Sequence, residues 1–214
     1  MSGLDLGSQP GLDTQVTRGR FSWQVVIVTG GAGGIGGAIV HRFLSDGAKV
    51  AILDMNEEAA AAKIREISDA GVDTEVSDKY SDDTIMYSMQ GRVKYFKINV
   101  TSRSECFRVV TDVVSVFGKV HHLVNCVAYF GSESLLATEQ DWDRTMRVNV
   151  AGSSFMVQAV TQVMQEYSRN ENCSVVNISS ISAHQTQPNR WTYAASKVLI
   201  MFLSHDQTMM SREL

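Results

Sequence analysis

Basic charge is scarce in this sequence, and the little that is present does not cluster. The 214 residues carry 19 lysines and arginines against 23 aspartates and glutamates, which gives a net charge of -4. No run of basic residues compensates locally, so the chain lacks the surface that attracts phosphate backbones. Nucleic acid is therefore not an expected partner.

Cysteines are also few. Cys106, Cys126 and Cys173 are widely spaced, odd in number and form no C-x-x-C pair. This pattern excludes a secreted disulfide framework and predicts reduced thiols. The histidines lack the spacing of zinc ligands, so no metal is predicted.

Long apolar runs are absent as well. No stretch is long and apolar enough to span a bilayer, and residues 1–20 lack the basic flank and apolar core of a secretory signal. We therefore expect a cytoplasmic protein without a membrane span. Residues 1–22 are rich in turn formers and predict a mobile tail, followed by a single domain over residues 23–214.

From Trp23 onward, short β-branched runs alternate with longer periodic ones. The continuous apolar run Val25-Val26-Ile27-Val28 is typical of a strand covered on both faces in a parallel sheet. Alternating strands and helices predict an α/β fold, a doubly wound parallel sheet of the Rossmann type with helices on both faces. The predicted strands are Gln24 to Thr29, Lys49 to Asp54, Val93 to Val100, His122 to Cys126 and Ser174 to Ser179.

Helical periodicity fills most of the intervening sequence. Ser102-x-x-Glu105 and Thr138-x-x-Asp141 each place a hydroxyl before a carboxylate, a pattern that caps a first helical turn. The predicted helices have their apolar residues at Ile35, Ile39, Phe43 and Leu44, within Ala59 to Ile67, at Phe107, Val110, Val113, Val114 and Phe117, and within Trp142 to Val163. The stretch from Gly71 to Arg92 is acidic and aperiodic and predicts a long loop, either a tolerated surface insertion or a partner-binding segment.

A glycine-rich turn follows the first predicted strand, from Thr29 to Gly36. There Gly30 permits a tight turn, Gly34 lets the backbone approach a pyrophosphate and Gly36 allows the next helix to pack closely. The amide groups of that helix end would stabilise the anion without a basic side chain. A plain glycine turn is the alternative.

Asp54 closes the second predicted strand, where a carboxylate can accept hydrogen bonds from an adenosine ribose. It would repel a 2′-phosphate, so NAD is favoured over NADP as the cofactor. The alternative for Asp54 is a cap on the following helix.

Tyr193 and Lys197 lie four residues apart and share a helical face, downstream of Ser180 at a strand end. An ammonium beside a phenol favours the phenolate, which suits general acid/base catalysis, and a serine hydroxyl can polarise a carbonyl. Together with the glycine turn, these residues predict a nicotinamide-dependent oxidoreductase. An ordinary surface Tyr/Lys pair and a strand-end serine are the alternatives.

Asn149 lies inside a helical pattern, where a buried amide side chain needs a reason. It is predicted to anchor a water beside Lys197, and a satisfied interior asparagine without a catalytic role is the alternative.

From Trp23 to the last residue, these motifs resemble the short-chain dehydrogenase/reductase family. The resemblance implies that helices carrying Asn149 and Tyr193 form a homo-oligomer. It also implies cofactor contacts for Gly30, Gly34, Ile35 and Gly36 at the pyrophosphate, Asp54 at the ribose, Asn99 and Val100 near the adenine, Asn125 near the nicotinamide ribose, and a catalytic tetrad of Asn149, Ser180, Tyr193 and Lys197.

The chain departs from the family pattern in places. Asn99-Val100 replaces Asp-Val, and Asn125-Cys126-Val127-Ala128 replaces Asn-Asn-Ala-Gly, which loses a glycine that allows close cofactor approach. The sequence stops at Leu214, where the family continues with further strands and a substrate-covering helix. We therefore expect a truncated sequence, a splice form or a weak enzyme.

The expected function is an NAD(P)-dependent oxidoreductase that transfers a hydride between the nicotinamide and a small secondary alcohol or ketone. The segment of the chain around Tyr129, Phe130, Leu135 and Leu136 favours apolar substrates. The alternative is a non-catalytic dinucleotide-binding or dimerising protein that lacks turnover because the chain is short.

Overall fold

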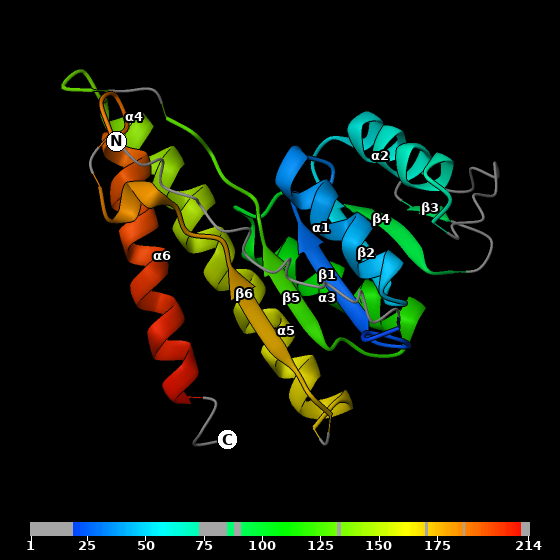
Figure 1. Cartoon of the computed structure of the whole chain (residues 1–214). Helices are drawn as coiled ribbons and strands as arrows, with labels where there is room; N and C mark the ends of the chain where they lie inside the picture. Colours follow the sequence, from blue (N-terminus) through cyan, green and yellow to red (C-terminus); the bar gives the residue numbers. More distant parts are fainter. Residues whose placement is uncertain are drawn as a thin grey trace, which may run out of the picture.

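The computed structural model describes residues 19–72, 85–87, 91–131, 134–169, 171–185 and 187–210. A six-stranded sheet of order β3-β4-β2-β1-β5-β6 forms its centre (Figure 1). Neighbours among β4, β2, β1, β5 and β6 pair in parallel, as predicted, whereas β3 is antiparallel to β4. The strands are β1 Val25–Thr29, β2 Lys49–Asp54, β3 Ile85–Tyr87, β4 Val93–Lys97, β5 His122–Asn125 and β6 Ser174–Asn177.

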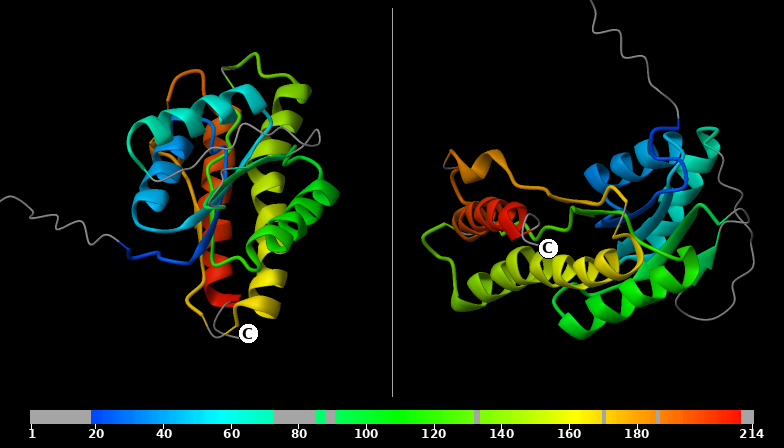
Figure 2. Two further views of the ribbon diagram at one scale, coloured as in Figure 1. Left: turned by 90° about the vertical axis from the view of Figure 1, so that its right-hand side faces the viewer. Right: turned by 90° about the horizontal axis from the view of Figure 1, so that it is seen from below.

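Helices cover both faces of the sheet, because each parallel connection crosses over one face. Figure 2 shows α1 and α2 on one side and α3 and α5 on the other. The helices are α1 Gly34–Ser45, α2 Glu57–Asp69, α3 Arg103–Phe117, α4 Glu139–Thr145, α5 Ser153–Tyr167 and α6 Trp191–Met210, with a short 3₁₀ helix, η2, over Ile181–Ala183.

The core consists of two apolar layers that the alternating side chains of the strands supply. Val25 and Ile27 of β1 point into the layer under α3 and α5, whereas Val26 and Val28 point into the layer under α1 and α2. All of these valines and the isoleucine are buried, which explains the continuous apolar run that predicted this strand.

The continuous helix formed by α4, η1 and α5 contains a section with a wider helical turn. Its middle section, Met146–Gly152, is a π-helix labelled η1, and it places Asn149 among buried residues. The predicted helix over Trp142 to Val163 is thus continuous but not uniformly α-helical. Wide turns of this kind recur at functional sites.

The capping predictions differ in outcome. Thr138 and Asp141 form a complete capping box, in which each side chain meets the other's backbone amide group. Ser102 accepts from the amide of Glu105, but the Glu105 carboxylate instead accepts from the amide of Asn99 at 3.0 Å.

The start of the folded region and the acidic stretch need correction. The Phe21 ring packs 4.8 Å from that of Phe43, whereas Trp23, predicted to open the fold, is 81% exposed. Residues 1–18 of the predicted tail lie outside the described residues. Within the predicted loop, Ile85–Tyr87 is the edge strand β3, too short for any periodicity to reveal, and residues 73–84 and 88–90 lie outside the described residues.

Candidate active site

The glycine turn joins β1 to α1 at the carboxyl edge of the sheet. Gly30 has a φ of +66°, and a Cβ there would lie 3.0 Å from the amide nitrogen of Val127. A Cβ on Gly36 would lie 2.1 Å from the carbonyl oxygen of Gly30, which explains why the helix can pack so close only with glycine there. Gly34 differs, since a Cβ there would meet nothing within 4 Å. Of the three glycines predicted to serve the cofactor site, Gly30 and Gly36 therefore serve the fold and Gly34 faces open space.

No capping or acidic side chain neutralises the partial positive charge at the amino end of α1. Its N-cap, Gly33, makes no side-chain capping bond, and the first turn contains no acidic residue. The unpaired amides at this end leave a partial positive charge, which suits an anionic group. Ile35, predicted to belong to the buried face of this helix, is instead 65% exposed at the same end.

Asp54 lies beside this turn. Its carboxylate accepts from the amide of Ala32 at 3.2 Å and from that of Asn56 at 3.1 Å. The cap of α2 is Asn56, which accepts from the amide of Ala59. Asp54 therefore does not cap the next helix itself, and its carboxylate is fixed against the glycine turn.

Thr29 joins the ends of β1 and β5. Its hydroxyl oxygen accepts from the amides of Cys126 at 3.1 Å and Val127 at 3.3 Å, and it donates to Asn125. Sequence reasoning missed this residue, although a lone threonine at the end of an apolar strand was the available signal. The hydroxyl fixes the spacing between the two turns that border the candidate cofactor site.

Asn125 points into the protein. It is 4% exposed, and its Nδ2 donates to Asn177 Oδ1 at 2.9 Å and to the carbonyl of Ser153 at 3.2 Å. These bonds tie β5 to β6 and α5. The side chain predicted to lie near the nicotinamide ribose is thus engaged inside the fold, and the backbone carbonyl of Asn125 accepts from the amide of Ile178 at 3.0 Å.

Asn99 and Val100 follow β4 at the same edge. Asn99 Oδ1 accepts from the amide of Thr101 at 3.1 Å and from its hydroxyl at 2.8 Å, which closes a tight turn. Val100 is buried, and a Cβ on Gly152 of the π-helix would lie 2.8 Å from its side chain. This contact holds the wide turn against the end of β4.

Asn149 is fully satisfied at 1% exposure. Its Oδ1 accepts from the amide of Tyr129 at 2.7 Å, while its Nδ2 donates to the carbonyl of Tyr129 and to Ser196 Oγ. These bonds are those of a satisfied interior asparagine, the alternative raised from the sequence. They also join the segment after β5 to α6, one residue from Lys197.

Tyr193 and Lys197 share a face of α6, as their spacing predicts. The Lys197 Nζ lies 5.7 Å from the Tyr193 ring centroid and donates to the carbonyl of Ile178 at 2.7 Å. Both side chains are buried. Burial lowers the pKa of Lys197, and the neighbouring Cys126 offsets part of that effect.

Ser180 follows β6 and caps η2. Its Oγ accepts from the amide of Ser182 at 3.1 Å, and the side chain is half-buried. The preceding residue, Ser179, donates to the carbonyl of Lys197 at 3.0 Å. The serine segment and the lysine are therefore directly joined.

An aromatic stack covers the tyrosine. The Phe130 ring lies 4.7 Å from that of Tyr193 with 25° between their planes, and the Arg190 guanidinium lies within 6.0 Å of both ring centroids. Phe130 was predicted only as part of a substrate segment, and no local pattern in the sequence links it to Arg190.

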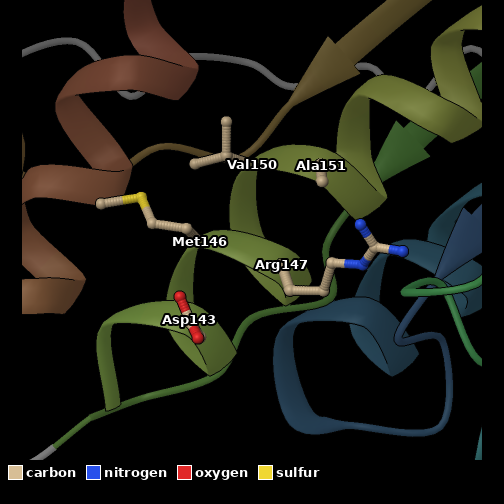
Figure 3. A pocket seen from close by; sticks show the side chains of 5 residues that line it. All are labelled: Asp143, Met146, Arg147, Val150 and Ala151. Atoms are coloured by element: carbon tan, nitrogen blue, oxygen red, sulfur yellow. The ribbon is translucent and has the colours of Figure 1, made fainter. Parts of the chain in front are cut away.

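A separate hollow of about 530 Å³ lies on α4 and η1 (Figure 3). Five residues line it, none of them a predicted site residue: Asp143, Met146, Arg147, Val150 and Ala151.

Within the described residues, no cluster of three or more histidine, cysteine or acidic side chains could hold a metal. Among these same residues, no helix combines the length and apolar character needed to cross a bilayer.

Comparison with known proteins identifies the family. Residues 24–212 match the short chain dehydrogenase family. The 3-oxoacyl-acyl-carrier-protein reductase of Thermotoga maritima is 31% identical over 83% of this chain and 64% of its own length. A probable galactose dehydrogenase of Rhizobium meliloti is 32% identical over 84% of this chain and 62% of its own.

Solved structures share the fold. A short chain dehydrogenase from Mycobacterium smegmatis superposes with a TM-score of 0.77 at 25% identity, over 92% of this chain and 74% of that one. A xylitol dehydrogenase with bound NAD⁺ gives 0.74 at 27% identity, over 89% and 65%. The chain spans less than two thirds of the length of the curated relatives named above. On its sequence and its fold, the chain belongs to the short-chain dehydrogenase family.

Proposed function

We propose that this chain is an NAD(P)-dependent oxidoreductase, with NAD preferred, that acts on a secondary alcohol or ketone. The observation that carries the proposal is the shared edge of the sheet. The glycine turn after β1, Asp54 at the end of β2 and the Lys197 contact after β6 all lie at the carboxyl ends of parallel strands. Ligands bind in this position in open α/β sheets.

A dinucleotide fits the residues at this edge. Gly34 leaves its approach open, the end of α1 offers amides to a pyrophosphate, and the fixed Asp54 carboxylate can accept from ribose hydroxyls. The same carboxylate repels a 2′-phosphate, which supports the preference for NAD. When bound, the nicotinamide supplies the hydride chemistry.

The catalytic residues divide the remaining work. Tyr193 gives a proton to, or takes one from, the substrate oxygen through its Oη, and the Lys197 ammonium lies beside it, 5.7 Å from the ring centroid. Ser180 Oγ donates a hydrogen bond to the substrate oxygen, where charge develops. Asn149 holds the segment at Tyr129 and, through Ser196, the helix α6 that carries Tyr193 and Lys197.

Removing the Tyr193 hydroxyl tests the catalytic assignment. We expect Tyr193→Phe to reduce NAD⁺-dependent alcohol oxidation by at least about a hundredfold, because general acid/base catalysis contributes that much. Binding of NADH, followed by fluorescence, should persist. Tyr167→Phe is the matched control, since Tyr167 is exposed on α5. Full turnover by Tyr193→Phe would refute the mechanism.

A non-catalytic dinucleotide-binding protein is the second candidate. The observation in its favour is the cover on Tyr193, which leaves this side chain only 6% exposed beneath Phe130. Titrating NADH and NADPH and then screening alcohols for absorbance change separates the two candidates, because binding without turnover supports the second.

We also propose that the chain forms a homo-oligomer. Analytical ultracentrifugation, which measures the mass in solution, tests this proposal.

A further inference from the structure

Phe130 occupies a position from which it meets any substrate of Tyr193. Its ring lies nearly parallel to the phenol, with 4.7 Å between centroids, a separation typical of an offset stack. Tyr193 is 6% exposed, whereas Phe130 is 59% exposed. One face of the phenylalanine therefore covers the tyrosine, and much of the remaining ring is open to solvent.

Three residues outside the segment from Tyr129 to Gly131 hold the ring and its neighbours in place. Arg190, which precedes α6, has its guanidinium 5.6 Å from the Phe130 ring centroid and donates to the carbonyl of Gly131 at 3.5 Å. Asn149 fixes both backbone polar groups of Tyr129, and Arg144 lies 4.3 Å from the Tyr129 ring centroid. The segment from Tyr129 to Gly131 is thus clamped on both sides of Phe130.

The clamp therefore holds an exposed apolar ring beside the candidate acid/base residue. A substrate oxygen must come within hydrogen-bond reach of Tyr193 Oη. With the Phe130 ring one stacking distance from the phenol, a substituent that extends from the reacting carbon toward this side meets the phenylalanine. A flat apolar ring gains stacking and burial there, whereas a short alkyl chain gains little.

We propose that Phe130 is an aromatic wall of the substrate site, positioned by Arg190, and that the site selects secondary alcohols and ketones with a flat apolar ring beside the reacting carbon. This inference rests on the proposed function. Phe130 contacts the ring of the substrate, and Arg190 acts through Phe130 and Gly131.

Paired ligands test the wall. Acetophenone carries the ring and 2-butanone does not, and both bind measurably by saturation-transfer NMR if the site accepts ketones. We expect Phe130→Leu to weaken acetophenone binding about tenfold, the worth of a good aromatic pair, and to leave 2-butanone unchanged. Phe202→Leu is the control, because Phe202 is a similarly exposed aromatic residue on α6 at 64%. Acetophenone binding that is absent, or that Phe130→Leu leaves intact, would overturn the proposal.

Substitutions of Arg190 test its positioning role. Arg190→Gln removes the cation and should weaken acetophenone binding several-fold, whereas Arg190→Lys keeps a cation over the ring and should recover part of the loss. A structural role alone would weaken both ketones equally and would not be rescued by lysine. Arg65→Gln, on the exposed face of α2, is the control.

The result is separable from failure of the proposed function. Each acetophenone titration is run with and without NADH, and NADH binding is followed in the same sample. A protein that fails to bind NADH refutes the proposed function, while a Phe130-dependent preference for acetophenone in the protein alone still supports the wall. A ring preference that survives Phe130→Leu contradicts the wall, whatever the cofactor does.

Discussion

At the scale of single residues, Asp54 shows how backbone amides prepare a side chain for a ligand. Hydrogen bonds from Ala32 and Asn56 fix the carboxylate next to the glycine turn, where we propose that its charge acts on the ribose end of a dinucleotide. A fixed charge discriminates better than a mobile one, because no rotation relieves the repulsion of a second anion.

Substituting Asp54 should change the choice of cofactor. We expect Asp54→Ala to raise the affinity for NADPH relative to NADH by on the order of tenfold, because the repulsion of the 2′-phosphate is lost. Fluorescence titration of both cofactors measures the ratio. Asp69→Ala, at the exposed end of α2, serves as control. A ratio that stays constant would remove Asp54 from the ribose site.

Asn149 is a second residue with a measurable role. Asn149→Ala would leave the amide and carbonyl of Tyr129 without these partners, at a cost of about 3 kcal/mol in the free energy of unfolding. Urea denaturation measures this loss. The exposed Asn172→Ala should change the same free energy by less than about 0.5 kcal/mol. Equal effects of the two substitutions would contradict the bonding described.

At the scale of elements, the turn between β1 and α1 separates folding from binding. A methyl group on Gly36 collides with the carbonyl of Gly30, whereas a methyl group on Gly34 enters open space. Substitution of Gly36 is therefore expected to affect folding, whereas substitution of Gly34 is expected to affect binding alone.

Alanine substitutions test this difference. Gly36→Ala should lower both the melting temperature and NADH affinity, because the backbone must shift to admit the methyl group. Gly34→Ala should keep the melting temperature and lower only NADH affinity, since the methyl group occupies the approach to the helix end. Thermal melts and fluorescence titration together measure both effects. Loss of stability in Gly34→Ala would show that this glycine serves the fold instead.

Most elements were predictable because their patterns are local. The buried strands were predicted to within a few residues, and the largest error, the end of β4, arose because Ile98 and Val100 are apolar and buried although the chain has already left the sheet. The edge strand β3 escaped because three residues show no periodicity. The inward side chain of Asn125 and the stack of Phe130, Tyr193 and Arg190 depend on contacts between distant segments, which no local pattern reveals.

At the scale of the whole molecule, the edge of the sheet opposite the candidate site has its own buried polar cluster. His122 hydrogen bonds to Ser174 Oγ and to Gln24 Oε1, each at 2.8 Å. The adjacent His121 accepts from the amide of Val25 and contacts the Glu171 carboxylate. Burial, together with a smaller effect of the neighbouring His121, lowers the pKa of His122 to about 4.

This pKa makes stability depend on pH. His122 stays neutral in the folded state while the unfolded chain takes up a proton below about pH 6.5, so its contribution is present above that value and is lost as the pH falls toward about 4. The loss is at most about 3 kcal/mol. Urea unfolding at several pH values gives the free energy of unfolding as a function of pH. Between about pH 4 and 6.5, this free energy should rise less steeply with pH for His122→Gln than for the exposed control His41→Gln. Identical slopes would count against the assignment.

The π-helix between α4 and α5 sets the phase between two halves of one rod. Rewinding Met146–Gly152 into an ordinary α-helix without removing a residue would rotate everything downstream by about 100°. Met156 and Val160 would then leave the apolar layer that they fill. Removing one residue together with the rewinding would keep these inward faces in place, so relatives without the wide turn are expected to align here with a one-residue gap.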